Sequence, residues 1–344
     1  MTTKHKQKPY SIHFVCRGNT YRSRLAAAYM DTLVDDRFVI SSSGIGAKHS
    51  PIKTSEPYTK ATAKAHKLTY GIADYKTQTT SELLAEADVI VFMNKDVYEE
   101  AVTTYAFDVR KSIVWHVPDM DALKKQQSLA QHNQQALIDA AAGTFTAIRR
   151  HCEKLYVYLT HTAWVDIVDK HNQAVHMRLP MGWATDRGLW HRGVHVVVRT
   201  HDGKFVVGKR NKSIVFAPNM LEISLGGGID SGESAIQAAV RETREELGVS
   251  LPETAFRPMF MYRQIGYHPH YHKQTRGHVY VYTVTLPAHA GPLRPQPEEV
   301  AELRLLSPRQ VRMLIRTHRM KHFGRLKWGY KLYDKAVAYS MLPR

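Results

Sequence analysis

The first half of the chain alternates between two hydrophobic patterns. Short apolar runs of strand length recur, and between them lie stretches with apolar residues three and four positions apart. Strands are predicted at residues 10–15, 37–41, 88–93 and 112–117. Helices are predicted at residues 23–33, 55–66, 81–87, 95–104 and 137–159. This alternation is typical of an α/β fold with a doubly wound parallel sheet, whose active site lies at the carboxyl ends of the strands.

The second half has more strands and fewer helices. Strands are predicted at residues 165–169, 174–177, 193–199, 204–209, 222–225 and 278–286. One helix follows a glycine-rich stretch, and a last helix is expected to start at Pro308. Strands around one helix predict an α+β sandwich. The expected domains are residues 1–158 and 162–310, followed by a basic, aromatic helical segment at 311–344.

One polar stretch of the second half does not fit either pattern. Residues 267–273 read Tyr-His-Pro-His-Tyr-His-Lys, and the histidines continue to His278. Alternating histidines can chelate a transition metal. Pro269 and the polar neighbours instead favour a mobile loop over an active site, which is the interpretation we adopt.

Composition indicates a cytoplasmic globular protein. Of the 344 residues 43% are hydrophobic, and no apolar run approaches membrane-spanning length. Two cysteines exclude a disulfide framework and fit a reducing cytoplasm. Residues 1–10 are basic but lack the apolar core of a secretory signal.

The net charge of +17 is concentrated at the C-terminal end. Residues 307–344 hold 10 Lys and Arg against 1 Asp, which gives +9, and aromatic residues lie between them. A basic field attracts anionic substrates. We expect this segment either to bind RNA or an acidic partner, or to form a solvated helical face that covers the second domain.

A strand, a loop with a cysteine and a helix open the first domain. Backbone N–H groups of such a loop point at one spot, where Arg22 can hold two phosphate oxygens. The same positive field favours a thiolate, so Cys16 is a candidate nucleophile. The other loop residues expected to bind phosphate are Arg17, Gly18, Asn19, Thr20, Tyr21 and Ser23.

The spacing of Cys16, Arg22 and Ser23, with Gly18 and Asn19 inside the loop, resembles the low-molecular-weight protein tyrosine phosphatases. The resemblance covers residues 8–158. It implies that Cys16 attacks phosphorus to form a phosphocysteine, that the Ser23 hydroxyl stabilises the thiolate, and that no cofactor is needed.

The same resemblance implies an aspartic acid that protonates the leaving oxygen. Asp119 is the expected acid because it follows a predicted strand and a proline; Asp121 is the alternative. Met120 stands where the family has proline. Tyr21 stands where many members have a second, protective cysteine. An arsenate reductase-like activity is a minor alternative, since only Cys152, which we expect to be buried, remains for a redox relay.

Three carboxylates follow the glycine-rich stretch of the second domain. Glu242, Glu245 and Glu246 are three or four residues apart on a predicted helix, so they lie on neighbouring turns. Like charges destabilise a helix unless a cation binds to them. Hard oxygen ligands favour Mg²⁺ or Mn²⁺, with a substrate phosphate completing the coordination.

This stretch resembles the Nudix box, with Thr243 in place of an aliphatic residue. The matching positions are Gly227, Glu233, Arg241, Glu242, Glu245, Glu246, Gly248 and Val249. The resemblance implies an α+β Nudix fold with a mixed sheet between helices. It also implies hydrolysis of a nucleoside diphosphate linked to a further group, with Mg²⁺ or Mn²⁺ as cofactor.

The resemblance also implies a role for each of these residues. The implied metal ligands are Glu242, Glu245, Glu246 and the Gly227 carbonyl, and Glu245 is assigned to catalysis. Glu233 and Arg241 are implied to support the loop and helix by pairing. Glu299 is a candidate base, and His191 is either a structural or a substrate-side histidine.

Both motifs together predict a cytoplasmic, bifunctional phosphohydrolase. One site would act on phosphomonoesters, with phosphotyrosine in proteins among them, and the other on phosphoanhydrides such as nucleotide conjugates. The fusion suggests that the two sites act in sequence. The alternative is a regulatory protein that binds a phosphorylated ligand or RNA, with one or both sites inactive. No membrane partner is expected.

Overall fold

The computed structural model describes residues 8–49, 56–68, 76–119, 134–214, 217–268, 273–317, 319–320 and 334–342. The chain divides into two compact units, Met1–Thr162 and Ala163–Arg344. Across the described ranges, no helix is both long enough and apolar enough to cross a membrane.

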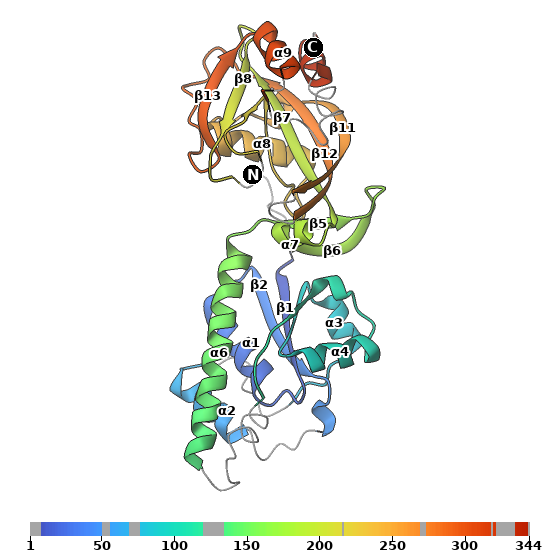
Figure 1. The fold of residues 1–344 in the computed structure, drawn as a ribbon, viewed down its shortest axis with the longest axis vertical. Coiled ribbons are helices and arrows are strands. Elements are labelled where there is room, and N and C mark those ends of the chain that lie inside the picture. The colour runs from blue at the N-terminus through green and yellow to red at the C-terminus, as the bar shows by residue number, and fades with distance from the viewer. Residues whose placement is uncertain are drawn as a thin grey trace. The chain divides into compact units, whose positions relative to one another are not determined.

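The first unit is built on a parallel sheet with strand order β2-β1-β3-β4 (Figure 1). Its strands are β1 (Tyr10–Cys16), β2 (Phe38–Gly44), β3 (Val89–Phe92) and β4 (Ser112–Val114). Its helices are α1 (Arg22–Leu33), α2 (Glu56–Ala65), α3 (Ser81–Glu86), α4 (Lys95–Thr104) and α6 (Gln134–Thr160), with short 3₁₀ turns at Ala47–His49 and Val109–Lys111.

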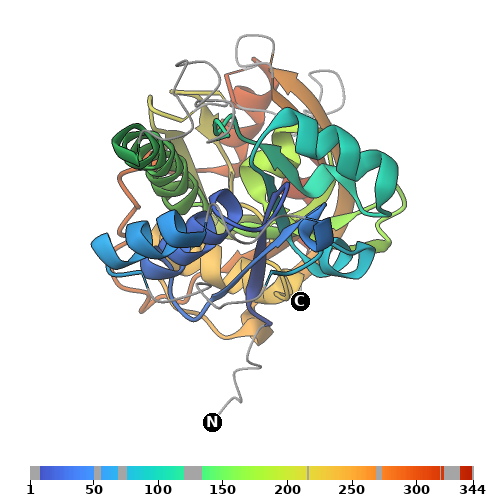
Figure 2. The same ribbon diagram turned by 90° about the horizontal axis from the view of Figure 1, so that it is seen from below.

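Helices cover both faces of this sheet, with α1, α2 and α6 on one side and α3 and α4 on the other (Figures 1 and 2). All four residues of β3 are buried, as a strand covered on both faces requires. Phe92 packs with Val97 and Ala101 of α4. The predicted doubly wound α/β fold is therefore confirmed, and the parallel strands bring Cys16 and Gly44 to one edge of the sheet.

The second unit is built on a mixed sheet. Its strands are β5 (Trp164–Val168), β6 (Ala174–Pro180), β7 (Trp190–Arg199), β8 (Phe205–Arg210), β9 (Leu221–Glu222), β10 (Ser224–Leu225), β11 (Arg257–His268), β12 (Lys273–Thr285) and β13 (Val300–Leu306). Its helices are α7 (Met181–Asp186), α8 (Ala235–Leu247) and α9 (Pro308–Arg316), with a 3₁₀ turn at Glu253–Ala255 and further helical residues at 334–340. Strands β7 and β12 are parallel, while β7 pairs antiparallel with β5.

Strand β7 lies between two hydrophobic cores. Val194 and Val196 pack with the alanines of α8, and Val197 packs in the core that contains Val311 and Ile315 of α9. Successive side chains of a strand point to opposite faces, so one valine-rich strand can serve both cores. The mixed sheet between helices is the predicted arrangement, and it is confirmed.

The prediction of a loop at residues 267–273 is wrong for the described part. Strands β11 and β12 form a long hairpin in which Tyr267 pairs with Gln274 and His268 with Lys273. The strand β11 was not predicted because Pro258 and Gly266 interrupt its pattern. Proline is tolerated here because it lies beside a bulge of an edge strand. Residues 269–272, and residues 321–333 of the basic segment, lie outside the described ranges.

Candidate functional site

The loop between β1 and α1 wraps around the sulfur of Cys16. The cysteine is only 2% exposed, and its Sγ atom lies 3.0 Å from Ser23 Oγ. The backbone N–H of Asn19 donates to the same sulfur at 3.2 Å. A backbone N–H donor and a neighbouring hydroxyl are an environment that favours a thiolate.

Asn19 supports this loop from within. Its φ of +49° is left-handed, a conformation that asparagine tolerates better than most residues. Its side-chain NH₂ donates to Ser23 Oγ and to Ser42 Oγ, both at 3.0 Å. Its side-chain oxygen accepts from the N–H of Thr77 at 2.9 Å. Asn19 therefore connects the loop by hydrogen bonds to Ser42 and Thr77, which are distant from it in the sequence.

Gly44 lies directly under the loop, at the end of β2. A Cβ atom at this position would lie 2.5 Å from Asn19 N and 2.7 Å from the Gly18 carbonyl carbon. Both neighbours are backbone atoms, which cannot move aside as a flexible side chain can. A glycine is required at this position because the backbone of the loop approaches so closely.

We expect Gly44→Ala to destabilise the first unit by about 1–3 kcal/mol, the usual cost of overpacking, and to disrupt the cysteine loop. Gly46→Ala is the matched control, because its added Cβ meets no atom closer than 3.6 Å. Calorimetric unfolding of the full chain measures the difference. Equal transition temperatures for the two variants would contradict the close approach.

Arg22 joins the loop to the segment after β4. The arginine is buried, and one of its terminal nitrogens donates to the Val117 carbonyl at 3.2 Å. The other donates to a carboxylate oxygen of Asp119. The structure thus brings Asp119 to the cysteine loop, although 97 residues separate it from Arg22. Met120 and Asp121 lie outside the described residues.

The other loop residues differ in their surroundings. Arg17 is exposed and pairs with Glu100 at 2.7 Å. The Thr20 carbonyl accepts from Thr59 Oγ1 at 2.6 Å. The Tyr21 hydroxyl donates to the Ala141 carbonyl at 2.6 Å, and burial raises the pKa of Tyr21 to about 12. These contacts place Thr20 and Tyr21 as supports for the loop.

Sequence reasoning overlooked a buried histidine beneath this site. His13 is 1% exposed, and its ring nitrogens lie 2.7 Å from Ser41 Oγ and 2.7 Å from Ser43 Oγ. The Ser43 carbonyl in turn accepts from Ser23 Oγ at 3.2 Å. Burial lowers the pKa of His13 to about 4, so the ring is neutral near pH 7.

Because of this buried histidine, we expect the protein to become less stable as the pH falls. Below about pH 6.5, the ordinary pKa of His, the unfolded chain binds a proton at His13. The folded chain does not bind it until the pH reaches about 4. The free energy of unfolding should therefore drop by up to about 1.4 kcal/mol per pH unit across this window. Urea unfolding at several pH values should show a shallower slope for His13→Gln, while exposed His66→Gln keeps the wild-type slope. Parallel curves for all three proteins would contradict the assignment.

In the second unit, glycines let the loop before α8 approach β7. A Cβ on Gly226, whose φ is +143°, would lie 2.0 Å from the Val194 carbonyl oxygen. The Gly227 carbonyl accepts from Val194 N at 2.9 Å, which leaves a second lone pair on that oxygen. A Cβ on Gly227 would lie 2.6 Å from a carboxylate oxygen of Glu242. Gly227 is thus held close to the acidic helix.

Helix α8 has a clear capping signal at each end. Ser234 and Gln237 form a capping box at its start, and Gly248 ends it with a φ of +70°. Thr243 is fully buried and donates to the Ala239 carbonyl at 2.7 Å, so it satisfies its own hydroxyl. Glu242 and Glu246 are 8% and 7% exposed, whereas the side chain of Glu245 is 42% exposed.

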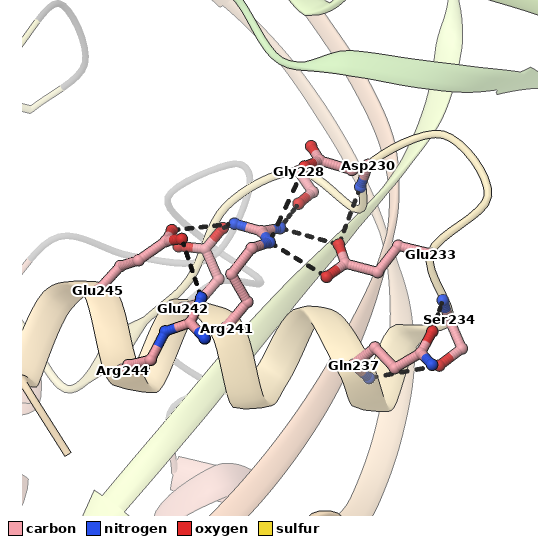
Figure 3. Close-up of polar contacts among 9 residues, drawn as sticks. All are labelled: Gly228, Asp230, Glu233, Ser234, Gln237, Arg241, Glu242, Arg244 and Glu245. Carbon is pink, nitrogen blue, oxygen red and sulfur yellow. Dashed lines mark hydrogen bonds and ion pairs between the residues drawn. The ribbon is translucent and has the colours of Figure 1, made fainter. Parts of the chain in front are cut away.

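Arg241 connects the carboxylates of the loop and the helix (Figure 3). It donates to both carboxylate oxygens of Glu233, at 3.1 Å and 3.0 Å. It also donates to Glu242 at 2.7 Å, to Glu245 at 3.2 Å and to the Gly228 carbonyl at 2.9 Å. One guanidinium therefore sets the spacing between the loop and two of the three helix carboxylates.

Burial disfavours the charged forms of Glu242 and Glu246. Burial raises the pKa of Glu242 to about 7, and the charges of Glu245 and Glu299 contribute in the same direction. Burial also raises the pKa of Glu246 well above its ordinary value, although Gly226 N donates to it at 2.7 Å. Among the described residues, no three acidic or imidazole groups already converge as a metal cage. The oxygen-only donors nevertheless fit a hard divalent cation, whose charge would offset their burial.

A pocket lies beside Glu246. Glu299 and Gly226 line it, as do Lys209, Arg210, Glu222, Ser224 and aliphatic side chains of β7, β8 and β13. Arg210 pairs with Glu222 at 2.7 Å. His191 is not among these lining residues; it is buried on β7, its Nδ1 atom lies 3.2 Å from the Leu189 carbonyl, and burial lowers its pKa. The structure thus brings Glu299 near the helix carboxylates and favours the structural role for His191.

Comparison with known proteins covers both units. The family model described as NUDIX domain matches residues 189–328. An uncharacterised Nudix hydrolase of Yersinia pestis is 31% identical over 148 residues, which are 43% of this chain and 75% of that protein. The chain belongs to the Nudix hydrolases. A second uncharacterised Nudix hydrolase, of Streptomyces coelicolor, is 36% identical over 141 residues, which are 40% of this chain and 70% of that protein.

The family model described as low molecular weight phosphotyrosine protein phosphatase matches residues 11–161. This Nudix hydrolase therefore also carries a phosphatase domain, and both families are hydrolases that act on phosphate esters and anhydrides. Nudix hydrolases generally need a divalent metal, whereas the phosphatase family needs none.

Solved structures resemble each domain separately. A crystal structure of a protein from Deinococcus radiodurans has 23% identity and a TM-score of 0.38, covering 49% of this chain and 98% of that chain. A low molecular weight protein tyrosine phosphatase from Streptococcus pyogenes has 20% identity and a TM-score of 0.33, covering 47% of this chain and 95% of that chain.

Several residues that build the two sites were missed by sequence reasoning. They are His13, Thr77, Asp166, Lys209, Arg210, Glu222 and Ser224 of this Nudix hydrolase. None belongs to the residues quoted for either motif. His13, Thr77 and Asp166 act through hydrogen bonds to distant segments, and the others line the pocket beside Glu246. A buried polar position inside a predicted strand, as at His13, is the signal that could have found some of them.

Proposed function

We propose that the chain is a bifunctional phosphohydrolase with two chemically independent active sites. The phosphatase domain would use Cys16 to hydrolyse phosphomonoesters, and the Nudix domain would use a divalent cation to hydrolyse phosphoanhydrides. The observation that best supports this proposal is that Arg22 contacts Asp119, so that the proposed phosphate-binding group and the proposed acid lie beside the loop of Cys16.

The phosphatase reaction follows from this arrangement. The thiolate of Cys16 attacks phosphorus while Asp119 protonates the departing oxygen, which yields an alcohol or phenol and a phosphocysteine. Water then attacks the phosphocysteine, Asp119 takes its proton, and inorganic phosphate leaves with the thiolate restored. Arg22 would exchange Asp119 for the phosphate oxygens, and Ser23 Oγ, 3.0 Å from the sulfur, would donate to the thiolate.

The Nudix reaction relies on the acidic helix. Glu242, Glu245, Glu246 and the Gly227 carbonyl would hold Mg²⁺ or Mn²⁺. When bound, such a cation polarises the bridging phosphates and lowers the pKa of the attacking water. Glu245 is exposed enough to turn from Arg241 toward a cation, and Arg241 stays fixed through Glu233. Glu299, which lines the pocket with Glu246, is the proposed acceptor of the proton from that water.

The test is a substrate panel on the wild-type chain. Aryl phosphates and a phosphotyrosine peptide report on the first domain, and nucleoside diphosphate conjugates report on the second. Phosphate release from the aryl phosphates should persist in EDTA, whereas nucleotide release should require added Mg²⁺ or Mn²⁺. Binding of RNA or phosphorylated ligands without turnover at either site would overturn the proposal in favour of a regulatory protein.

A further inference from the structure

The hairpin of β5 and β6 lies between the two family matches. The phosphatase match ends at residue 161 and the Nudix match begins at residue 189. Strand β5 (Trp164–Val168) nevertheless pairs with β7, and Val165 forms an antiparallel bridge with Asp230 of the glycine-rich loop. The hairpin is therefore packed against the Nudix loop.

Asp166 of this hairpin holds the tip of that loop. Ser231 Oγ donates to one of its carboxylate oxygens at 2.6 Å, and Gly232 N donates to the other at 3.1 Å. Ser231 N donates to the Trp164 carbonyl at 2.7 Å. Three hydrogen bonds from two consecutive loop residues thus end on β5, and two of them depend on a single side chain.

The loop tip is in turn coupled to the acidic helix. Glu233 N donates to the Asp230 carbonyl at 2.9 Å, and Asp230 N donates to a carboxylate oxygen of Glu233 at 3.1 Å. Glu233 accepts both hydrogen bonds from Arg241, which contacts Glu242 and Glu245 (Figure 3). Hydrogen bonds and the backbone of residues 230–233 therefore connect Asp166 to two proposed metal ligands.

We propose that Asp166 is a positioning residue for the metal site, and that the hairpin 164–180 is therefore a functional part of the Nudix domain. The inference rests on the proposed metal-dependent function. Asp166 is not among the proposed metal ligands; it fixes the turn that presents Glu233 to Arg241. Direct partners of metal ligands, here Arg241, commonly change metal affinity about 10–100-fold when removed. Asp166 acts on Arg241 through the loop, so its effect should lie near the lower end of that range.

The same hairpin offers a matched control. Asp169 accepts two backbone hydrogen bonds, from His171 N at 2.8 Å and Gln173 N at 2.9 Å, through one carboxylate oxygen. Asp169 therefore stabilises the turn between β5 and β6, and neither of these two hydrogen bonds involves the Nudix loop. Asp166→Ala and Asp169→Ala each remove two hydrogen bonds from one hairpin, so a general loss of stability should affect both.

The experiment measures Mn²⁺ binding to the full-length chain, by electron paramagnetic resonance of free Mn²⁺ together with thermal unfolding without metal. We expect Asp166→Ala to weaken Mn²⁺ binding about 10-fold, and Asp169→Ala to leave it within about 2-fold of wild type. Ser231→Ala should reproduce part of the Asp166→Ala effect, and the double variant should be no worse than Asp166→Ala alone.

Each result separates this inference from the proposed function. If wild type binds no Mn²⁺, or if Glu245→Gln binds as well as wild type, the proposed metal site itself fails. If Glu245→Gln weakens binding but Asp166→Ala binds like Asp169→Ala, only the positioning role is overturned. If Asp166→Ala fails to fold, Ser231→Ala decides: wild-type affinity in that variant contradicts the inference.

Discussion

Replacement of Cys16 by serine is expected to reduce phosphate release from aryl phosphates by at least about 10⁴-fold, since removing a catalytic nucleophile from a serine protease costs on the order of 10⁶-fold in kcat. The loss is large because a serine hydroxyl remains protonated where the thiolate would attack. Ser23 and Asn19 would still surround the new hydroxyl, so the fold of the loop should be kept. Steady-state kinetics with an aryl phosphate measures the change.

Cys152→Ser is the matched control for this variant. Cys152 is fully buried on α6, as expected, and burial raises the pKa of its thiol. The same chemical change there should lower stability somewhat and leave phosphatase turnover within a few-fold. Retention of activity in Cys16→Ser, or equal losses in the two variants, would exclude Cys16 as the nucleophile. Nucleotide release by the Nudix domain should be unchanged in both.

Replacement of Glu245 by glutamine is expected to lower metal-dependent nucleotide release by about 10²–10³-fold, the usual cost of removing one group that stabilises developing charge. Glutamine keeps the size of the side chain but removes the negative charge that a divalent cation would bind. Glu245 is the clearest choice because its side chain is 42% exposed, while Glu242 and Glu246 are buried. Nucleotide release measured across a range of Mg²⁺ concentrations reports the effect.

Glu253→Gln provides the control, because this glutamate begins an exposed 3₁₀ turn just after α8. It removes one negative charge from the same domain and should leave the Mg²⁺ dependence unchanged. A Glu245→Gln variant with wild-type turnover at every Mg²⁺ concentration would show that this carboxylate neither binds metal nor takes part in catalysis. Aryl phosphate hydrolysis serves as an internal measure of the amount of active protein, since Cys16 lies in the other domain, and thermal unfolding checks that the Nudix domain is folded.

The local sequence determined the two motifs and the class of each domain. Cys16 and Ser23 are 7 residues apart, and Asn19 N reaches the sulfur from within the same loop. The glutamates of α8 are spaced by the helix itself, so their common face follows from 3.6 residues per turn. The alternation of strand and helix patterns predicted the parallel sheet, because the spacing of the apolar residues indicates which face of each element is buried.

The roles of these residues are a different matter and stay predictions. The sequence nominated Asp119 through its proline and preceding strand, while the contact with Arg22 exists only in the folded chain. Strand β11 was not predicted, since local breakers such as Pro258 are tolerated at the edge of a sheet. Residues 267, 268 and 273, which pair in the hairpin of β11 and β12, were predicted as loop.

Only the tertiary structure decided which distant segments support each site. Gly44 lies under the cysteine loop because β1 and β2 are parallel and in register, with Cys16 opposite Gly44. Asp166 reaches Ser231 across 65 residues because β5 pairs beside β7. Such contacts depend on strand order and register, which local hydrophobic periodicity does not specify. The sequence thus determined what chemistry the chain carries, and the fold decided which residues hold that chemistry in place.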